Sequence, residues 1–147
     1  MKTKLFNGKF ELALRILLIL GQKEPAALDQ LLAFDFITTY ASSFDLSEYN
    51  LHGDNAFNYS EIASRRAMMD KGISLLRMHN LLDINYNTQN GYEYCLTDLG
   101  QSIARQLNDQ YAIEYRKVLS NVLGRYSKFS SKQLMKLIDS NLMKELE

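Results

Sequence analysis

Few side chains in the sequence have the types and spacings that catalysis or metal binding requires. The 147 residues include two histidines, His52 and His79, and one cysteine, Cys95. Neither histidine has a second ligand at the spacing of a zinc site, such as a histidine four residues away or a Cys-x-x-Cys pair. Cys95 alternates with Tyr94 and Leu96, which is typical of a small apolar residue in a strand. We therefore expect neither a metal site nor a thiol nucleophile.

The sequence also lacks the glycine-rich loops that hold phosphate groups. Neither the Gly-x-Gly-x-x-Gly pattern nor the P-loop pattern occurs. Carboxylates such as Asp45 and Glu48 lie in a polar stretch, where a solvated surface is the simplest interpretation. These patterns predict a chain that is not an enzyme, needs no cofactor and acts on no small-molecule substrate. An enzyme of unrecognised type is the third hypothesis, behind the two developed below.

Two adjacent arginines are candidates for DNA contact. Arg65 and Arg66 lie in the first turns of a predicted helix that would correspond to a recognition helix, from which such side chains reach base edges or phosphates. Against this interpretation, residues 42–59 separate this helix from the one before it, whereas a helix-turn-helix step takes about three or four residues. The predicted turn NTQNG also carries no lysine or arginine. Sequence-specific DNA binding by this chain alone is therefore the minority hypothesis.

Charge is unevenly distributed, although seventeen basic and seventeen acidic residues give a net charge of zero. Residues 24–64 contain no lysine or arginine, so we expect this stretch to repel phosphate and to suit a basic protein partner. Residues 116–136 contain no acid, and there Arg125, Lys128 and Lys132 are candidates for contact with DNA or an acidic partner. A solvated helical face explains the basic stretch equally well. The acids of the first stretch are Glu24, Asp29, Asp35, Asp45, Glu48, Asp54 and Glu61.

Apolar periodicity predicts three helices in the first half of the chain, at residues 10–20, 26–41 and 60–79. Pro25 suits the first turn of the second helix, because its missing N–H costs nothing there. Between the second and third helices, residues 42–59 predict a long loop. Structureless connections longer than about 12–15 residues are uncommon and are usually functional or held by a partner.

The second half begins with the clearest strand signal. The alternating runs LDINY and YEYCLT are joined by NTQNG, whose Asn90-Gly91 step supplies the positive φ angles of a tight hairpin. Thr97 or Asp98 then caps a helix, and a break at Asn108-Asp109 precedes another helix. A final amphipathic helix has a capping box and an apolar stripe, and it must dock on its own domain or on a partner. These residues are Ser130, Gln133, Leu134, Leu137, Ile138 and Leu142.

This order of elements predicts a mainly α fold with a small β-hairpin, namely a winged-helix-like domain with additional C-terminal helices. We expect the winged-helix-like domain at residues 1–126 and a C-terminal amphipathic docking helix at residues 127–147. The apolar run Leu12–Leu20 contains Arg15 and is about half the ~20 residues that a membrane span needs, so it predicts a buried helix. The single cysteine and the lack of a signal-like start favour the cytoplasm.

Four segments together resemble a known family. The segments LDQLLAFDFITTYASSF, NLHGDN, SEIASRRAMMDKGISLLRMHNLLDINY and LTDLG are similar to the middle component of the ABC-three-component systems, which include the bacterial Lamassu defence systems. The resemblance implies a small accessory subunit that works with an SMC-like ABC ATPase and an effector, often a nuclease, against phage or plasmid DNA. The chemistry would then belong to the other subunits, with DNA reached through the complex and no membrane involved.

Two functional hypotheses follow. The first is an adaptor that docks on the ATPase and restrains the effector; the second is a winged-helix transcriptional regulator, which would be a homodimer that binds its own promoter. For the adaptor, we expect charge reversal of Asp35 together with Asp54 to weaken ATPase binding without a large loss of stability. Tyr40 and Phe44 are either aromatic anchors or core residues. The expected partner contacts are Asp35, Tyr40, Phe44, Leu51, His52, Asp54 and Leu142.

Overall fold

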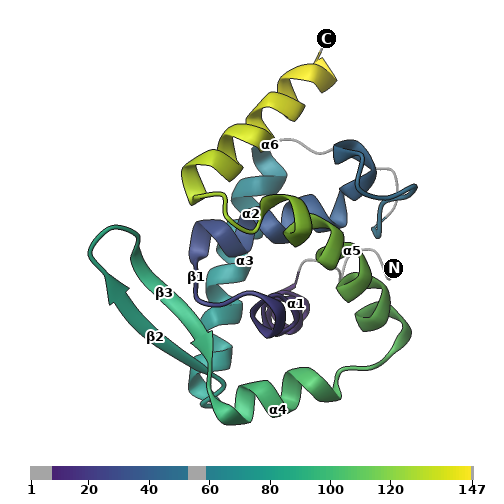
Figure 1. The fold of residues 1–147 in the computed structure, drawn as a ribbon. Coiled ribbons are helices and arrows are strands. Elements are labelled where there is room, and N and C mark those ends of the chain that lie inside the picture. Colours follow the sequence, from purple (N-terminus) through teal and green to yellow (C-terminus); the bar gives the residue numbers. More distant parts are fainter. Residues whose placement is uncertain (1–7, 53–58, 147) are drawn as a thin grey trace.

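The computed structural model describes residues 8–52 and 59–146, which form a mainly helical protein with a small three-stranded antiparallel sheet (Figure 1). The prediction of a mainly α fold with a β-hairpin is therefore confirmed. In chain order the elements are α1 (Lys9–Gln22), β1 (Ala26–Ala27), α2 (Leu28–Thr39), the 3-10 helix η2 (Ala41–Phe44), α3 (Tyr59–Met78), β2 (Leu82–Asn87), β3 (Gly91–Leu96), α4 (Asp98–Gln106), α5 (Gln110–Tyr126) and α6 (Ser131–Leu146).

Helix α1 lies in the middle of the fold and packs against α2, α3, α4 and α5 (Figure 1). It is apolar on most faces, and Leu12, Ile16 and Ile19 are completely buried. Burial of such side chains stabilises the fold by about 1.5–3 kcal/mol each. The apolar run Leu12–Leu20 is thus helical and, apart from the exposed Leu14, buried, as predicted. In the part of the chain that the structure describes, no helix is both long enough and apolar enough to cross a membrane.

The sheet has the order β1-β3-β2, so the predicted hairpin is confirmed and gains a third strand. The hairpin pairs Leu82 with Leu96 at its base and Asn87 with Gly91 at its turn, where Gly91 has a φ of 76°. Strand β1 pairs Ala26 with Tyr94, and therefore Pro25 precedes a strand. The expectation that Pro25 begins a helix is wrong. Two alanines carry no strand signal of their own, and the extended conformation is stabilised by pairing with β3.

The predicted loop between α2 and α3 begins with structure. The 3-10 helix η2 ends at Asp45, which has a left-handed φ of 58°. The Leu46 N–H donates to the Ala41 carbonyl at 2.9 Å, and the Ser42 N–H donates to the Asn50 side chain at 2.9 Å. The prediction of a loop is therefore wrong for residues 42–44, which lie in η2, and is confirmed for residues 45–52, where local hydrogen bonds order turns and bends. Residues 53–58 lie outside the described residues.

Helices α4 and α6 begin at predicted caps, and α5 begins at the predicted break, where Asp109 acts as a cap. Thr97 Oγ1 accepts a hydrogen bond from the Gly100 N–H at 2.9 Å, and Asp109 accepts from the Ala112 N–H at 2.9 Å. The predicted capping box is present as well, with the Gln133 N–H donating to Ser130 Oγ at 3.2 Å and the Ser130 N–H donating to Gln133 at 2.9 Å. These bonds satisfy N–H groups that the first turn of a helix leaves without partners.

Helix α6 packs its apolar stripe on α2 (Figure 1). Leu134, Ile138 and Leu142 are buried, with Leu142 only 4% exposed. This helix therefore docks on its own chain, and the expectation that Leu142 is a contact for a partner is corrected by its burial. The division of the chain at residue 126 stays a prediction. On α4, Leu99 is 52% exposed.

Candidate functional site

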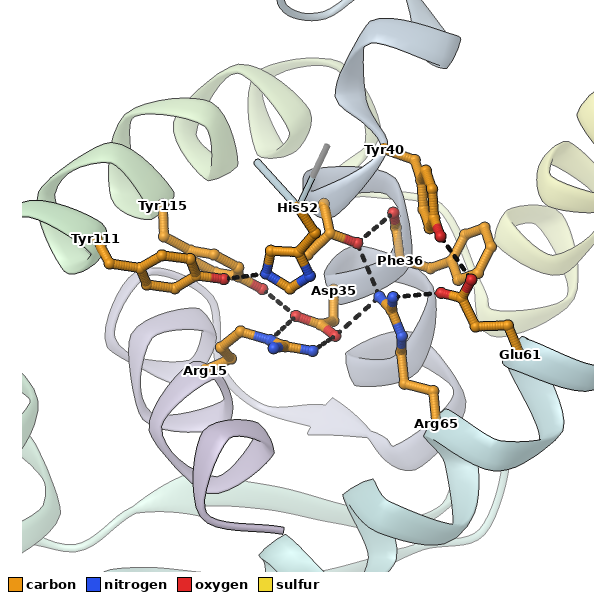
Figure 2. A network of polar contacts seen from close by, with 10 residues as sticks. Arg15, Asp35, Phe36, Tyr40, His52, Glu61, Arg65, Tyr111 and Tyr115 are labelled. Atoms are coloured by element: carbon orange, nitrogen blue, oxygen red, sulfur yellow. Dashed lines mark hydrogen bonds and ion pairs between the residues drawn. The ribbon is translucent and has the colours of Figure 1, made fainter. Parts of the chain in front are cut away.

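A buried network of charged and aromatic side chains centres on Asp35 of α2 (Figure 2). Arg15 of α1 donates to both carboxylate oxygens of Asp35, from Nε to Oδ1 and from Nη2 to Oδ2, each at 2.8 Å. Arg65 of α3 donates from Nη1 to Oδ2 at 3.2 Å. The three side chains are between 0% and 2% exposed. The carboxylate of Asp35 thus connects three helices.

The same network extends to a fourth helix and to the end of α2. The hydroxyl of Tyr115 on α5 donates to Asp35 Oδ1 at 2.5 Å. Arg65 also donates to Thr39 Oγ1 at 2.8 Å and to Glu61 Oε2 at 2.7 Å. Charge-assisted hydrogen bonds of this kind are stronger than neutral ones, and their geometry fixes the relative positions of the helices that carry them.

The electrostatics of the cluster hold its members in one protonation state. Burial alone would raise the pKa of Asp35, but the positive charges of Arg15 and Arg65 outweigh it and hold that pKa well below its usual range. Burial likewise raises the pKa of the Tyr115 hydroxyl well above its ordinary value, with the charge of Asp35 acting in the same direction. The carboxylate therefore stays ionised and the phenol stays protonated near neutral pH. Such a pair holds structure and is unsuited to exchanging protons with a substrate.

His52 lies beside this cluster and contacts α5 (Figure 2). Its Nε2 is 2.6 Å from the Tyr111 hydroxyl, and the two rings stack with centroids 5.8 Å apart. Burial, together with the positive charge of Arg15, lowers the pKa of His52 to about 3. The imidazole is therefore neutral at pH 7. His52 connects the segment after η2 to α5 through a neutral hydrogen bond.

Several residues that the sequence suggested as partner or DNA contacts lie in the interior. Asp35 is enclosed by two arginines and a tyrosine, and Arg65 is 1% exposed. Tyr40 and Phe44 are each 5% exposed, so both are core residues, which was one of the two alternatives for them. Asp35 and Arg65 cannot reach a partner or DNA from these positions, because their polar atoms face one another. The expectation of surface roles for these four residues is corrected accordingly.

The other suggested residues remain closer to the surface. Leu51 and His52 are half-buried, and Asp54 lies outside the described residues. Arg66 is 41% exposed and forms an ion pair with Asp29. The basic residues suggested for DNA contact are exposed, namely Arg125, Lys128 and Lys132. These residues stay candidates for contact with other molecules.

The acidic stretch is partly neutralised within the protein. Asp29, Asp35 and Glu61 all pair with arginines. Glu24 accepts a hydrogen bond from the Leu96 N–H at 3.0 Å. Counting acids along the sequence therefore overstated the negative charge of this surface, because the count cannot show which acids are paired. Within residues 8–52 and 59–146, no three His, Cys, Asp or Glu side chains lie together as a metal site requires.

Sequence reasoning missed Arg15 and Tyr115 as members of the cluster. A signal for Arg15 was present, since a lone arginine inside an apolar helix needs a carboxylate partner when it is buried. Tyr115 gave no comparable signal, because tyrosines occur in cores and on surfaces alike. The cluster thus joins residues that are 20 to 80 positions apart in the chain.

These features define a small, mainly helical protein whose helices are joined by a buried ion-pair cluster. Comparison with protein-family models gives a match over residues 5–147 to the family described as ABC-three component (ABC-3C) system Middle Component 2, and the chain belongs to that family. It is therefore a component of an ABC-three-component system. A search of curated proteins and a search of solved structures gave no significant match.

Proposed function

We propose that this chain is a non-catalytic accessory subunit that links an SMC-like ABC ATPase to an effector, such as a nuclease, in defence against phage or plasmid DNA. The observation that carries the proposal is the family match, which spans nearly the whole chain and names a middle component of a three-component system. A middle component works with other components by definition. The ATPase and the effector are the partners that we assign to it, and Lamassu-type systems are the setting that the resembling segments favour.

We further propose that the core is a winged-helix-like platform. The order α1-β1-α2-α3-β2-β3, with β1 and β2 on either side of β3, is the order of a winged helix, and α4, α5 and α6 are additions to it. Helix α3 then takes the position of a recognition helix. Such a fold serves protein docking as well as DNA binding, because function depends on the surface residues and not on the fold.

The buried cluster supports a docking role. It fixes α1, α2, α3 and α5 relative to one another through Asp35, so the surfaces that these helices present keep a constant geometry (Figure 2). A preorganised surface binds a partner at a lower entropic cost than a mobile one. The charged groups of the cluster pair with one another, which leaves the recognition of partners to the surface.

Contact with DNA, in this proposal, occurs within the complex. Arg125, Lys128 and Lys132 are exposed near the junction of α5 and α6 and can contribute phosphate contacts there. Removing them together would reduce DNA binding by the assembled complex and weaken its dependence on salt. Binding of the isolated chain to the ATPase would remain.

The test is direct binding between the purified chain and the ABC ATPase encoded beside it. We expect saturable binding in a titration followed by calorimetry, and co-elution in size-exclusion chromatography. An ABC ATPase from an unrelated transporter serves as the control and should not bind. A chain that stays monomeric and binds neither the ATPase nor the effector of its own system would contradict the proposal.

A winged-helix transcriptional regulator is the alternative, and the half-exposed Arg66 on α3 is the observation that favours it. This alternative requires a homodimer and a sequence-selective shift of the promoter of its own gene. The variant Arg66→Ala should then abolish the shift. Arg66 already pairs with Asp29, and Arg65 is buried, so α3 offers DNA fewer cations than its sequence suggests.

A further inference from the structure

A groove lies between α1 and the beginning of α5. It is a pocket of ≈ 230 Å³ whose wall is mostly apolar. Figure 1 shows α4, the following linker and α5 curving around α1, which places the groove's two sides on elements that are distant in sequence. Its apolar lining comes from Leu14 and Leu18 of α1, Leu107 of the linker, and Tyr111 and Ala112 of α5.

Large apolar side chains at this groove are exposed. Leu14 is 47% exposed, and Phe10, four residues earlier on the same side of α1, is 60% exposed. Ile113, the residue after Ala112 on α5, is 52% exposed. Single exposed apolar residues are common on protein surfaces, but a mostly apolar pocket with an exposed leucine in its wall is typical of a binding surface.

The charges around the groove select the kind of occupant. The pocket contains two carboxylates, Glu11 and Asp109, and one cation, Arg15. The guanidinium of Arg15 is bound by the buried carboxylate of Asp35 at two points, so its charge is already compensated. The rim is therefore net acidic. It complements a segment with basic flanks, whereas a second copy of this surface would bring acids against acids.

The two sides of the groove also select the secondary structure of the occupant. Both sides of the groove are formed by helices, α1 and the first turn of α5, joined by linker residues that form no strand. An extended peptide would find no strand edge here with which to pair. A helix satisfies its own backbone groups and can place apolar side chains in the groove at three- and four-residue steps.

We propose that this groove binds an amphipathic helix of another subunit of the same system, with apolar residues at i, i+3 or i+4, and i+7, and with lysine or arginine beside that stripe. The inference rests on the proposed function, because it assigns the docking surface of the accessory subunit. The apolar stripe fills the space between Leu14 and Tyr111. The basic flanks lie against Glu11 and Asp109.

Paired substitutions test whether apolar contacts in the groove contribute to binding. Leu14→Asp places a charge in the groove, and Leu99→Asp makes the same change at a residue of similar exposure, 52%, that does not line it. Affinity is measured by titrating each variant into the ATPase and, separately, into the effector of the same system. We expect Leu14→Asp to weaken binding to one of these subunits by roughly 10- to 100-fold. Leu99→Asp should stay within about twofold of the unmodified chain.

A second pair tests the acidic rim. Glu11→Lys reverses a charge in the groove, and Glu48→Lys reverses an exposed acid elsewhere. Glu11→Lys should weaken binding at low salt more than at high salt, because screening removes the charge contribution. Glu48→Lys should have no such effect. Circular dichroism establishes that each variant is folded, and Leu14→Ala, a milder change at the same position, replaces Leu14→Asp if the latter fails to fold.

The outcomes distinguish a failure of the groove assignment from a failure of the proposed function. If the unmodified chain binds neither subunit, the proposed function fails. If it binds but Leu14→Asp and Leu99→Asp bind equally well, the groove assignment is overturned while the accessory role stands. The assignment is also overturned if Leu14→Asp abolishes self-association of the chain, measured by sedimentation, and leaves subunit binding intact.

Discussion

Arg15 and Asp35 form a buried, two-point ion pair that joins α1 to α2, with both hydrogen bonds at 2.8 Å and both side chains at most 2% exposed. Each charge would be very costly to bury alone. The pair is stable because Arg65 and Tyr115 supply further hydrogen bonds to the same carboxylate. The relative placement of four helices thus depends on one aspartate.

Removing the charge of Asp35 should therefore destabilise the protein strongly. Asp35→Asn keeps the shape of the side chain but leaves two buried arginines without their counter-charge, and we expect a loss of about 3–5 kcal/mol in the free energy of unfolding. Urea denaturation measures the change. The control is Asp139→Asn on the exposed side of α6, which should change stability by less than about 0.5 kcal/mol. Equal stability of the two variants would show that the cluster does not support the fold.

Arg65 and Arg66 are neighbours in sequence but should respond very differently to substitution. Arg65→Ala removes a buried cation that bonds Asp35, Thr39 and Glu61, so we expect a loss of about 3–5 kcal/mol. Arg66→Ala removes a half-exposed pair with Asp29, for which a loss of about 1 kcal/mol or less is expected. Thermal and urea unfolding of both variants check this. A larger effect at Arg66 would contradict the assigned positions.

His52 should make stability depend on pH. Its pKa in the folded protein is lowered to about 3, below the 6.5 of an unperturbed histidine. Between these two values the unfolded chain binds a proton at His52 that the folded chain does not, so the free energy of unfolding falls as the pH is lowered from 6.5 towards 3. One such group contributes at most about 1.4 kcal/mol per pH unit.

The variant His52→Gln isolates this contribution. Glutamine can still bond the Tyr111 hydroxyl but does not titrate, so its stability should fall less steeply between pH 6.5 and 4.5. Urea unfolding at a series of pH values measures the slope. The matched control is His79→Gln, the same substitution at an exposed histidine. Parallel slopes for His52→Gln and the unmodified protein would refute the lowered pKa.

Two glycines in helices should give opposite responses to alanine. A Cβ at Gly100 would lie 2.2 Å from the carbonyl oxygen of Leu81, so α4 or the segment before β2 must shift. We expect Gly100→Ala to cost roughly 1–3 kcal/mol. A Cβ at Gly124 meets nothing within 4 Å, and Gly124→Ala should stabilise α5 by up to about 1 kcal/mol. Differential scanning calorimetry measures the stability of both variants. It should show a loss for Gly100→Ala and a gain for Gly124→Ala.

The elements of the fold could largely be predicted from local patterns. The hairpin followed from alternation and from the Asn90-Gly91 turn, and the caps at Thr97 and Ser130 followed from side chains that accept from free helix N–H groups. Strand β1 could not be predicted in this way. Its two alanines are extended because β3 is beside them, and that proximity is a property of the folded chain.

The candidate site was harder to predict, because its parts meet only in three dimensions. The sequence presented Asp35 as one acid in an acidic stretch and Arg65 as one base in a helix, and each looked like a surface charge. Their pairing depends on how α2 and α3 pack. A count of charges along the chain therefore suggested a more acidic surface than the folded protein has, because three of these acids pair with arginines. The groove beside Leu14 could not be predicted either. Leu14 belongs to an apolar run whose pattern predicts a buried helix.

The most direct test of the accessory role is reconstitution of the whole system with and without this chain. The effector is tagged and co-expressed with the ABC ATPase, either alone or together with the middle component, and the purified material is analysed for the ATPase by mass photometry and gel electrophoresis. If the chain links the two subunits, the ATPase should be recovered with the effector only when the chain is present, and Leu14→Asp should reduce that recovery. Equal recovery of the ATPase without the chain would contradict a linking role.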